Sequence, residues 1–300
     1  MKNNALNKKA VCFGEVLWDI TPEGRTPGGA PMNVAAHLQN LGVDVTLISR
    51  IGSDKLGSEL ESYLKNKYVN TQFIQRDEFH STCKVQADTS DKENVKYIFD
   101  TPTAWDFIEV TERNKQLVKE ADVFVFGSLA SRDDHSRKAL LEFLDIAKYK
   151  VFDVNFRSPF YEKEYVKLFL GKCNLAKMNE DELEVICRWF NFYGTEEEQL
   201  RYLRRKFKLE SICLTKGAEG AWLLEGENLY KQDGFPIEVV DTIGAGDSFL
   251  ATYITMWMQD KDPEARLTNA CAVGAVVSAF KGANPKIKVD DIFTIMAQYT

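Results

Sequence analysis

Short apolar runs alternate with helical patterns along most of the chain. Several of the short runs are apolar throughout, as expected for strands that are covered on both faces. The alternation predicts parallel β-α-β units and a three-layer α/β/α fold with a mostly parallel central sheet. The predicted strands are residues 11–14, 45–49, 122–127, 150–154, 173–178 and 211–215, and the predicted helices are residues 32–41, 56–66, 136–148, 180–190, 196–207, 247–258 and 264–280.

One segment breaks this alternation. Residues 82–88 and 95–99 have the pattern of a β-hairpin around the polar turn 89–94. A hairpin inside a β-α-β series indicates a small separate sheet, which would serve either as a lid over a site or as a dimer contact. Because open parallel sheets bind ligands beyond the carboxyl ends of their strands, we expect the chemistry in the loops that follow the strands.

Composition narrows the class of protein. The chain has 300 residues, of which 44% are hydrophobic and 28% are charged, as is usual for a globular enzyme. A net charge of −7 disfavours nucleic acid or an acidic membrane surface as the main partner. The first residues lack the long apolar stretch of a secretory signal, and the apolar run at 271–280 is only about half a membrane span.

The cysteines and histidines add no sign of a metal site. The six cysteines form no C-x-x-C pair, and the three histidines have no ligand spacing, so we expect no zinc. The cysteines have the pattern of small buried hydrophobic residues, which together with the missing signal favours the cytoplasm.

The most informative segment is residues 241–249, Asp-Thr-Ile-Gly-Ala-Gly-Asp-Ser-Phe. A glycine-rich turn that opens a helix presents free N–H groups at the positive end of the dipole, which is an anion site. Asp247 stands where the anion would bind, and a carboxylate there could accept a proton from a hydroxyl that attacks a phosphate. We expect the dipole to lower its pKa. The alternative is a structural helix cap with flanking glycines.

Two segments together resemble a known family. The chain lacks the P-loop, protein-kinase and dinucleotide motifs. Residues 241–249 instead resemble the C-terminal signature of the PfkB (ribokinase-like) sugar kinases, and residues 28–35, Gly-Gly-Ala-Pro-Met-Asn-Val-Ala, resemble their N-terminal signature. This wording is closer to fructokinases than to ribokinases, which tend to show Gly-Gly-Lys-Gly-Ala-Asn. The likeness extends from Val11 to about Pro285.

The resemblance implies a fold, a reaction and a set of partners. It implies one ribokinase-like domain over residues 1–300, with a β-lid at about 15–28 and 80–105 through which two copies would form a homodimer. The reaction would transfer the γ-phosphate of ATP to a sugar, with fructose as the leading substrate, Mg²⁺ as cofactor and K⁺ as a further candidate ion.

The resemblance also implies roles for individual residues. Asp247 would be the catalytic base, beside an anion hole made by Gly244, Ala245 and Gly246. The sugar would be bound by Asp19, Gly28, Gly29, Asn33, Asn155 and Arg157. The nucleotide would be bound by Asn179, Thr215, Gly217, Gly220, Asn269 and Gly282.

Three further residues are candidates for holding ions. Glu182 would place Mg²⁺ through water, although Asn179 and Glu182 also fit a capping box. The segment around Asp241 and Ile243 would hold a monovalent cation together with the loop after Gly282. Lys286 in that loop would replace the cation, or it is an ordinary exposed lysine.

Several rival functions stay open from the sequence. Ribose, 2-keto-3-deoxygluconate and nucleosides are alternative acceptors for the same machinery. A sugar or nucleotide sensor on the same fold is a different class, but the intact Gly-Ala-Gly-Asp turn argues against it. A dinucleotide-dependent oxidoreductase would need a glycine fingerprint in the first β-α unit, which the residues after Phe13 do not provide.

Overall fold

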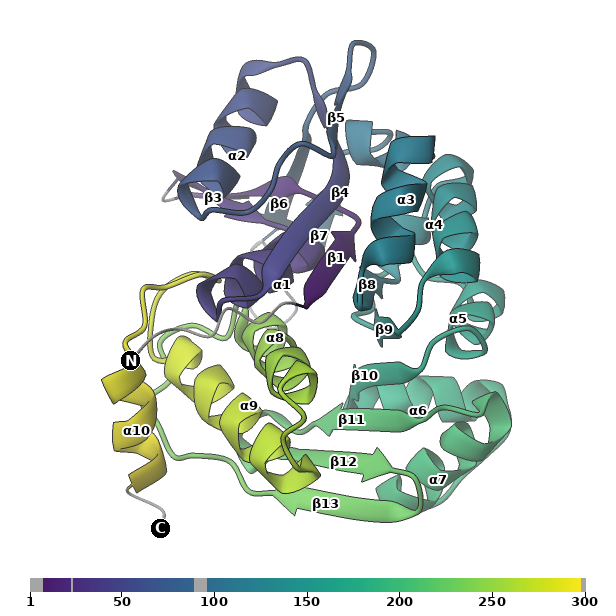
Figure 1. The fold of residues 1–300 in the computed structure, drawn as a ribbon, viewed down its shortest axis with the longest axis vertical. Helices are drawn as coiled ribbons and strands as arrows, with labels where there is room; N and C mark the ends of the chain where they lie inside the picture. The colour runs from purple at the N-terminus through teal and green to yellow at the C-terminus, as the bar shows by residue number, and fades with distance from the viewer. Residues whose placement is uncertain (1–7, 23, 89–95, 298–300) are drawn as a thin grey trace.

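A large, mostly parallel sheet forms the centre of the molecule. The structure is a computed structural model that describes residues 8–22, 24–88 and 96–297. Within them, nine strands form a sheet in the order β13-β12-β11-β10-β9-β8-β1-β4-β5, from the bottom to the top of Figure 1. The strands from β5 to β11 pair in parallel, and β12 and β13 add an antiparallel edge. Their bounds are Lys9–Phe13 (β1), Asp44–Gly52 (β4), Ile74–Asp77 (β5), Val123–Gly127 (β8), Lys150–Asp153 (β9), Leu175–Asn179 (β10), Ser211–Thr215 (β11), Ala221–Glu225 (β12) and Asn228–Gln232 (β13).

The order in which strands are added to the sheet reverses direction at β1. β1 pairs with β4 on one side and with β8 on the other, so successive units extend the sheet in opposite directions from β1. Loops that leave the carboxyl ends of β1 and β8 therefore diverge, and such a switch point leaves room for a ligand.

Helices cover both faces of this sheet (Figure 1). Alternate residues of β1 enter different cores: Val11 and Phe13 pack under α3–α7, whereas Ala10 and Cys12 pack under α1, α2, α8 and α9. The first group spans Glu112–Glu120 (α3), Asp134–Ile146 (α4), Lys163–Leu170 (α5), Glu180–Trp189 (α6) and Glu196–Phe207 (α7). The second spans Ala30–Asn40 (α1), Lys55–Asn66 (α2), Ala245–Met258 (α8) and Pro263–Ser278 (α9), and α10 (Val289–Ala297) packs beside α9.

A second, four-stranded sheet lies outside the main one. Its order is β3-β2-β6-β7, with bounds Gly24–Gly28 (β3), Leu17–Thr21 (β2), Cys83–Asp88 (β6) and Lys96–Phe99 (β7). β6 and β7 pair in antiparallel fashion, as the predicted hairpin requires, while its turn at 89–94 lies outside the described residues. Trp105, which follows this hairpin, is fully buried under the Arg132 guanidinium, so it packs in the core.

The predicted fold class is confirmed, and the elements that the pattern missed have weak signals. α3 has only two buried residues, Asn114 and Val118, and α5 is only 8 residues long. The antiparallel edge strands β12 and β13 were also missed; β13 is partly exposed along its length and has no continuous apolar run.

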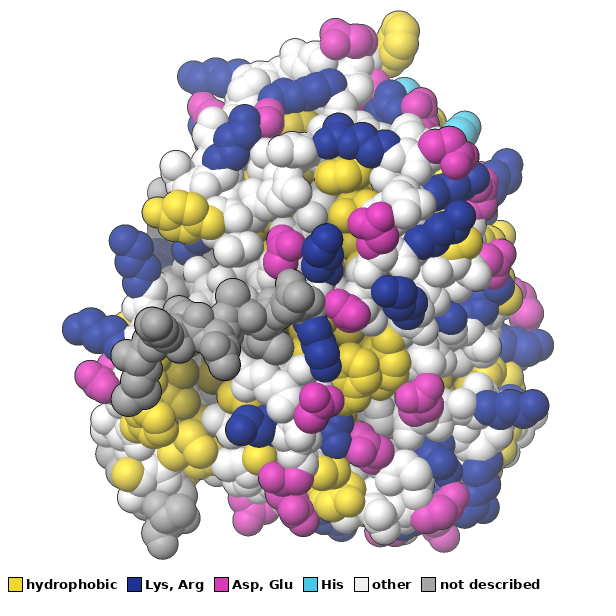
Figure 2. All heavy atoms as spheres, in the orientation of Figure 1, with side chains coloured by type: hydrophobic (Ala, Val, Ile, Leu, Met, Phe, Trp, Pro, Cys, Tyr) yellow, Lys and Arg dark blue, Asp and Glu magenta, His cyan; other side chains and the backbone are white. Residues whose placement is uncertain are grey.

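Charges of both signs are mixed on the surface. On the face seen in Figure 2, the described Lys and Arg side chains alternate with Asp and Glu, without an extended basic stripe of the kind that binds nucleic acid. No helix in the described part of the chain is both long and apolar enough to span a bilayer.

Candidate active site

The predicted phosphate-binding turn lies at the start of α8. Gly244 is the N-cap residue, with a φ of 81° that favours glycine. A Cβ at Gly244 would lie 2.5 Å from the Cα of Ala283, so close packing also requires glycine. Ala245 donates its N–H to the Thr242 carbonyl. The N–H groups that follow it in the first helical turn have no carbonyl within the helix to bond to, so they are free to bind an anion. The turn therefore has the backbone of an anion site.

The carboxylate of Asp247 stands in the first turn of α8 and is partly buried. Its Oδ2 accepts a hydrogen bond from Asn33 Nδ2 over 2.8 Å. Desolvation and the nearby charge of Asp153 raise the pKa of Asp247 to about 6, against the opposing effects of Lys177, Asn33 and Arg157. Our expectation of a lowered pKa is therefore wrong, because burial among acidic groups outweighs the helix dipole. A base with this pKa is still ionised at neutral pH.

A buried lysine that the sequence reasoning missed lies beside the turn. Lys177, in β10, is 8% exposed, and its Nζ lies 3.0 Å from Asp153 Oδ1. A Cβ at Gly246 would lie only 3.1 Å from that Nζ, so glycine lets the ammonium group approach the turn. Burial alone would lower the pKa of Lys177, but Asp153, Glu182 and Asp247 together raise it. The ammonium therefore stays charged next to the anion site.

The predicted sugar-binding residues of the second sheet lie close together. A Cβ at Gly28 would lie 2.1 Å from Asp19 Oδ2, and a Cβ at Gly29 would lie 2.5 Å from the Glu15 carbonyl oxygen. The two glycines thus make room for the loop after β1 and for the Asp19 carboxylate. Desolvation raises the pKa of Asp19 to about 6 and that of Glu15 to about 7, although Arg157 opposes both shifts.

The loop after β9 brings Asn155 and Arg157 to the same region. Asn155 has a φ of 40°, and its carbonyl accepts from Ser128 Oγ in the loop after β8. Arg157 is exposed, and its charge lowers the pKa values of Asp19 and Asp247. The guanidinium therefore lies near the carboxylates of both predicted subsites.

Asn179 and Glu182 form the capping box at the start of α6. Asn179 Oδ1 accepts from the Glu182 N–H, and Glu182 Oε2 accepts from the Asn179 N–H. Glu182 Oε1 accepts from the Phe156 N–H over 2.8 Å, which ties α6 to the loop that carries Arg157. The observed contacts of both residues are therefore those of a helix cap. Their roles in binding the nucleotide and Mg²⁺ stay predictions.

The remaining nucleotide candidates differ in their surroundings. Thr215 ends β11, and Gly217, with a φ of 54°, has open space where a Cβ would be. Gly220 is required by packing, because a Cβ there would lie 2.0 Å from the Gln232 carbonyl oxygen. Asn269 donates to the Ala265 carbonyl within α9. Their roles in nucleotide binding stay predictions.

The Asp241 carboxylate links the two segments of the candidate cation site, residues 241–243 and the loop at Gly282. Asp241 accepts from the Ile243 N–H over 3.0 Å and from the Gly282 N–H over 2.9 Å. Lys286 is exposed, whereas Lys67 contacts this loop, since its Nζ donates to the Asn284 carbonyl over 2.9 Å. Whether Lys286 replaces a cation stays a prediction.

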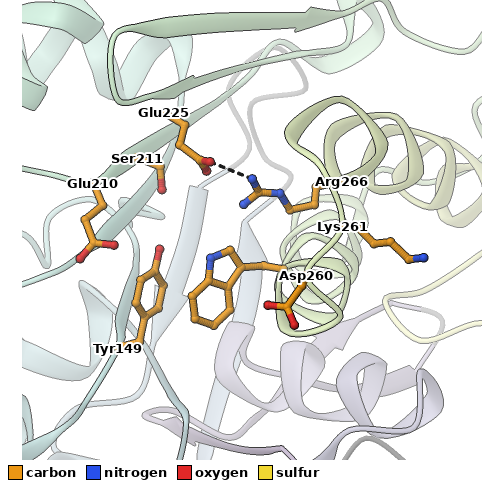
Figure 3. A pocket seen from close by; sticks show the side chains of 8 residues that line it. Tyr149, Glu210, Ser211, Glu225, Asp260, Lys261 and Arg266 are labelled. Atoms are coloured by element: carbon orange, nitrogen blue, oxygen red, sulfur yellow. Dashed lines mark hydrogen bonds and ion pairs between the residues drawn. The ribbon is translucent and has the colours of Figure 1, made fainter. Parts of the chain in front are cut away.

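A separate pocket of about 320 Å³ lies at the amino ends of the strands (Figure 3). It contains the stacked rings of Tyr149 and Trp257 and the ion pair of Arg266 with Glu225. Ser211, which begins β11, lines this pocket, whereas Thr215 at the other end of that strand is a predicted site residue. The pocket therefore lies away from the predicted active site.

Comparisons with known proteins agree with this geometry. The chain is 28% identical to Fructokinase-2 of Solanum lycopersicum over 306 residues, which cover 92% of each chain. It is also 28% identical to "Probable fructokinase-5" of Arabidopsis thaliana, with 92% and 93% covered. A crystal structure of fructokinase with bound ATP from Xylella fastidiosa superposes with a TM-score of 0.86 at 21% identity, covering 97% of this chain and 98% of that one. The model of the pfkB family carbohydrate kinases matches residues 6–289, so the chain belongs to this family.

Proposed function

We propose that this carbohydrate kinase transfers the γ-phosphate of ATP to fructose, with Asp247 as the base. The observation that carries the proposal is the meeting of three groups at one helix start: the Asp247 carboxylate, the N–H groups of the Gly246 turn and the buried Lys177 ammonium. The fructokinase names of the relatives support fructose as the acceptor.

The reaction follows from the charges at this helix start. The sugar oxygen attacks the γ-phosphorus as its proton passes to Asp247, and the bond from that phosphorus to the bridging oxygen of ADP breaks. The turn N–H groups and Lys177 stabilise the negative charge that develops on the transferring phosphoryl group. Enzymes that transfer phosphoryl groups lower the barrier mainly by stabilising this charge. Asp19 and Asn33 would accept from and donate to the sugar hydroxyls.

The described residues fit a nucleotide with a loosely held divalent ion. Asp153 Oδ2 is buried beside Lys177 without a hydrogen-bond partner in the described part of the chain. A carboxylate oxygen is a ligand that Mg²⁺ accepts directly or through water, and the bound ion would neutralise phosphate charge. No cluster of three or more His, Cys, Asp or Glu side chains forms a metal cage among the described residues, so phosphates and water would supply most ligands.

Three further parts of the proposal concern a monovalent ion, the second sheet and the cellular compartment. K⁺ is proposed at the Asp241 segment, since a fructokinase structure from Vibrio cholerae is named as a potassium-bound form. The second sheet is proposed as a lid and homodimer contact, since Ile98 on β7 is 57% exposed. The cytoplasm is proposed because all six cysteines are buried and unpaired.

A coupled assay of ADP release tests the choice of sugar. We expect kcat/KM for fructose to exceed that for ribose, 2-keto-3-deoxygluconate and nucleosides by at least about tenfold, because a pocket built for one set of hydroxyls leaves polar groups unpaired with another. A higher kcat/KM for any other acceptor would replace fructose as the substrate and leave the kinase assignment intact.

Gly28→Ala should weaken sugar binding. The added methyl group would displace the Asp19 carboxylate, and loss of a hydrogen bond to a charged group corresponds to a rise in KM for fructose of about tenfold or more. We expect kcat and the KM for ATP to change little. Gly171→Ala is the control, because its Cβ meets only ordinary contacts at 3.5 Å at the end of α5. An unchanged KM for fructose would exclude Asp19 from the sugar site.

A further inference from the structure

Two side-chain amides connect Asp247 to the loop that follows α9. Asn33 in α1 donates to Asp247 Oδ2 over 2.8 Å, and Asn284 Nδ2 donates to Asn33 Oδ1 over 2.7 Å. Asn33 is only 4% exposed. Segments that are far apart in the sequence therefore meet at one carboxylate through a chain of hydrogen bonds.

The charge on Asp247 decides which way both amides point. An ionised carboxylate only accepts, so Asn33 must present its NH₂ group to Asp247. The Asn33 oxygen then faces away in a buried place and needs a donor, because an unsatisfied buried acceptor is costly. Asn284 provides that donor, and the hydroxyl of Tyr63 in α2 also interacts with the Asn284 side chain.

The backbone around Asn284 is held from two helices. Lys67, at the end of α2, donates to the Asn284 carbonyl over 2.9 Å. His37 Nε2 in α1 lies 2.9 Å from the carbonyl oxygen of Ala283, which can only accept, so the ring donates there. These contacts fix the direction in which the Asn284 side chain leaves the loop.

We propose that Asn284 is a positioning residue, which holds the Asn33 amide with its N–H side toward Asp247. The proposal rests on the proposed role of Asp247 as the base. Without Asn284, the Asn33 amide would lose the donor to its oxygen and would rotate toward other partners. Asp247 would then lose a hydrogen bond that favours its charged form, and its pKa would rise.

Other charged groups around Asp247 stay in place when Asn284 is changed. Asp153 in β9 opposes ionisation of Asp247, whereas Lys177 in β10 and Arg157 favour it, and the pKa of Glu15 responds to the Asp247 charge. Near Asn284 itself lie the side chains of Lys67, Lys286, His37 and Tyr63. An uncharged replacement of Asn284 therefore isolates the contribution of the amide.

Carboxyl-carbon NMR of protein labelled with ¹³C at aspartate tests the proposal without substrate. The Asp247 signal is identified by its absence in Asp247→Asn. We expect its titration midpoint to rise by about one pH unit in Asn284→Leu, a shift that corresponds to a typical hydrogen bond to a charged group. Asn284→Ala, which adds neither bulk nor charge, should shift it in the same direction. The acid limb of kcat/KM for fructose should move with it, while kcat at high pH stays within about threefold.

Lys288→Met is the matched control, because it removes one exposed charge from the same loop and leaves the donor to Asn33 in place. Its midpoint should stay closer to wild type than that of either Asn284 variant. An unmoved Asp247 midpoint in folded Asn284→Leu or Asn284→Ala would overturn the proposal. A midpoint shift without turnover of any sugar would uphold the amide orientation and count against the proposed function alone.

Discussion

Asp247→Asn should lower kcat by about 10²–10⁴-fold, the usual cost of losing a general base. The asparagine keeps the size of the side chain, and its oxygen can still accept from Asn33. The sugar and the nucleotide are held by other groups, so we expect both KM values to stay within a few-fold of wild type. Steady-state kinetics with fructose and ATP, together with thermal unfolding, separate loss of chemistry from loss of fold.

Asp262→Asn provides the control for helix capping. Asp262 caps α9 by accepting from the Ala265 N–H, so its replacement changes a helix-start aspartate without touching the anion turn. We expect near wild-type kcat from it. If Asp247→Asn also kept near wild-type kcat, Asp247 would be only a structural residue of its helix. Loss of both affinities or of folding would equally contradict the role of a base.

Lys177→Met should reduce both turnover and stability. The methionine fills the space of the lysine stem but removes the ammonium beside Gly246, and loss of one donor to a developing charge typically lowers kcat by about 10²–10³-fold. It also leaves the buried Asp153 carboxylate unpaired, which costs about 3–5 kcal/mol of unfolding free energy in comparable pairs. Enzyme kinetics and denaturant unfolding measure the two effects.

The double variant Lys177→Met/Asp153→Asn tests whether lost stability alone explains the lost turnover. Removing the unpaired charge should restore much of the stability, but kcat should stay low because the ammonium and the Asp153 carboxylate proposed to place Mg²⁺ are both missing. Recovery of kcat together with stability would mean that Lys177 acts only as a structural partner of Asp153. A folded Lys177→Met protein with near wild-type kcat would remove the residue from the site altogether.

Local patterns were enough to predict the fold class and the start of α8. The predicted helix at 247–258 begins only two residues after the observed start of α8 at Ala245. The start could be predicted closely because a glycine-rich turn, with Gly244 at a left-handed φ, is followed directly by helical apolar spacing. The glycines at 28 and 29 were predicted to bind the sugar; the structure shows Asp19 and Glu15 packed next to them, and the sugar-binding role stays a prediction.

What the sequence could not predict depends on packing between distant segments. The raised pKa of Asp247 comes first from burial and then from Asp153, and neither is visible in the turn sequence. Lys177 lies inside the predicted strand 173–178, and no role was predicted for it there. A signal was present, since a lysine among buried strand residues needs a partner such as Asp153. Asn284 carries no local signal, because its importance arises only where the loop after α9 meets α1.

Phosphoryl transfer from ATP to a sugar can be followed by ³¹P NMR of the protein with ATP, Mg²⁺ and fructose. We expect the ATP signals to disappear as ADP and a sugar phosphomonoester appear in equal amounts, and we expect the Asp247→Asn protein to produce neither at a comparable rate. Formation of ADP with inorganic phosphate alone, or an unchanged ATP spectrum with every sugar tested, would contradict phosphoryl transfer from ATP to a sugar at this site.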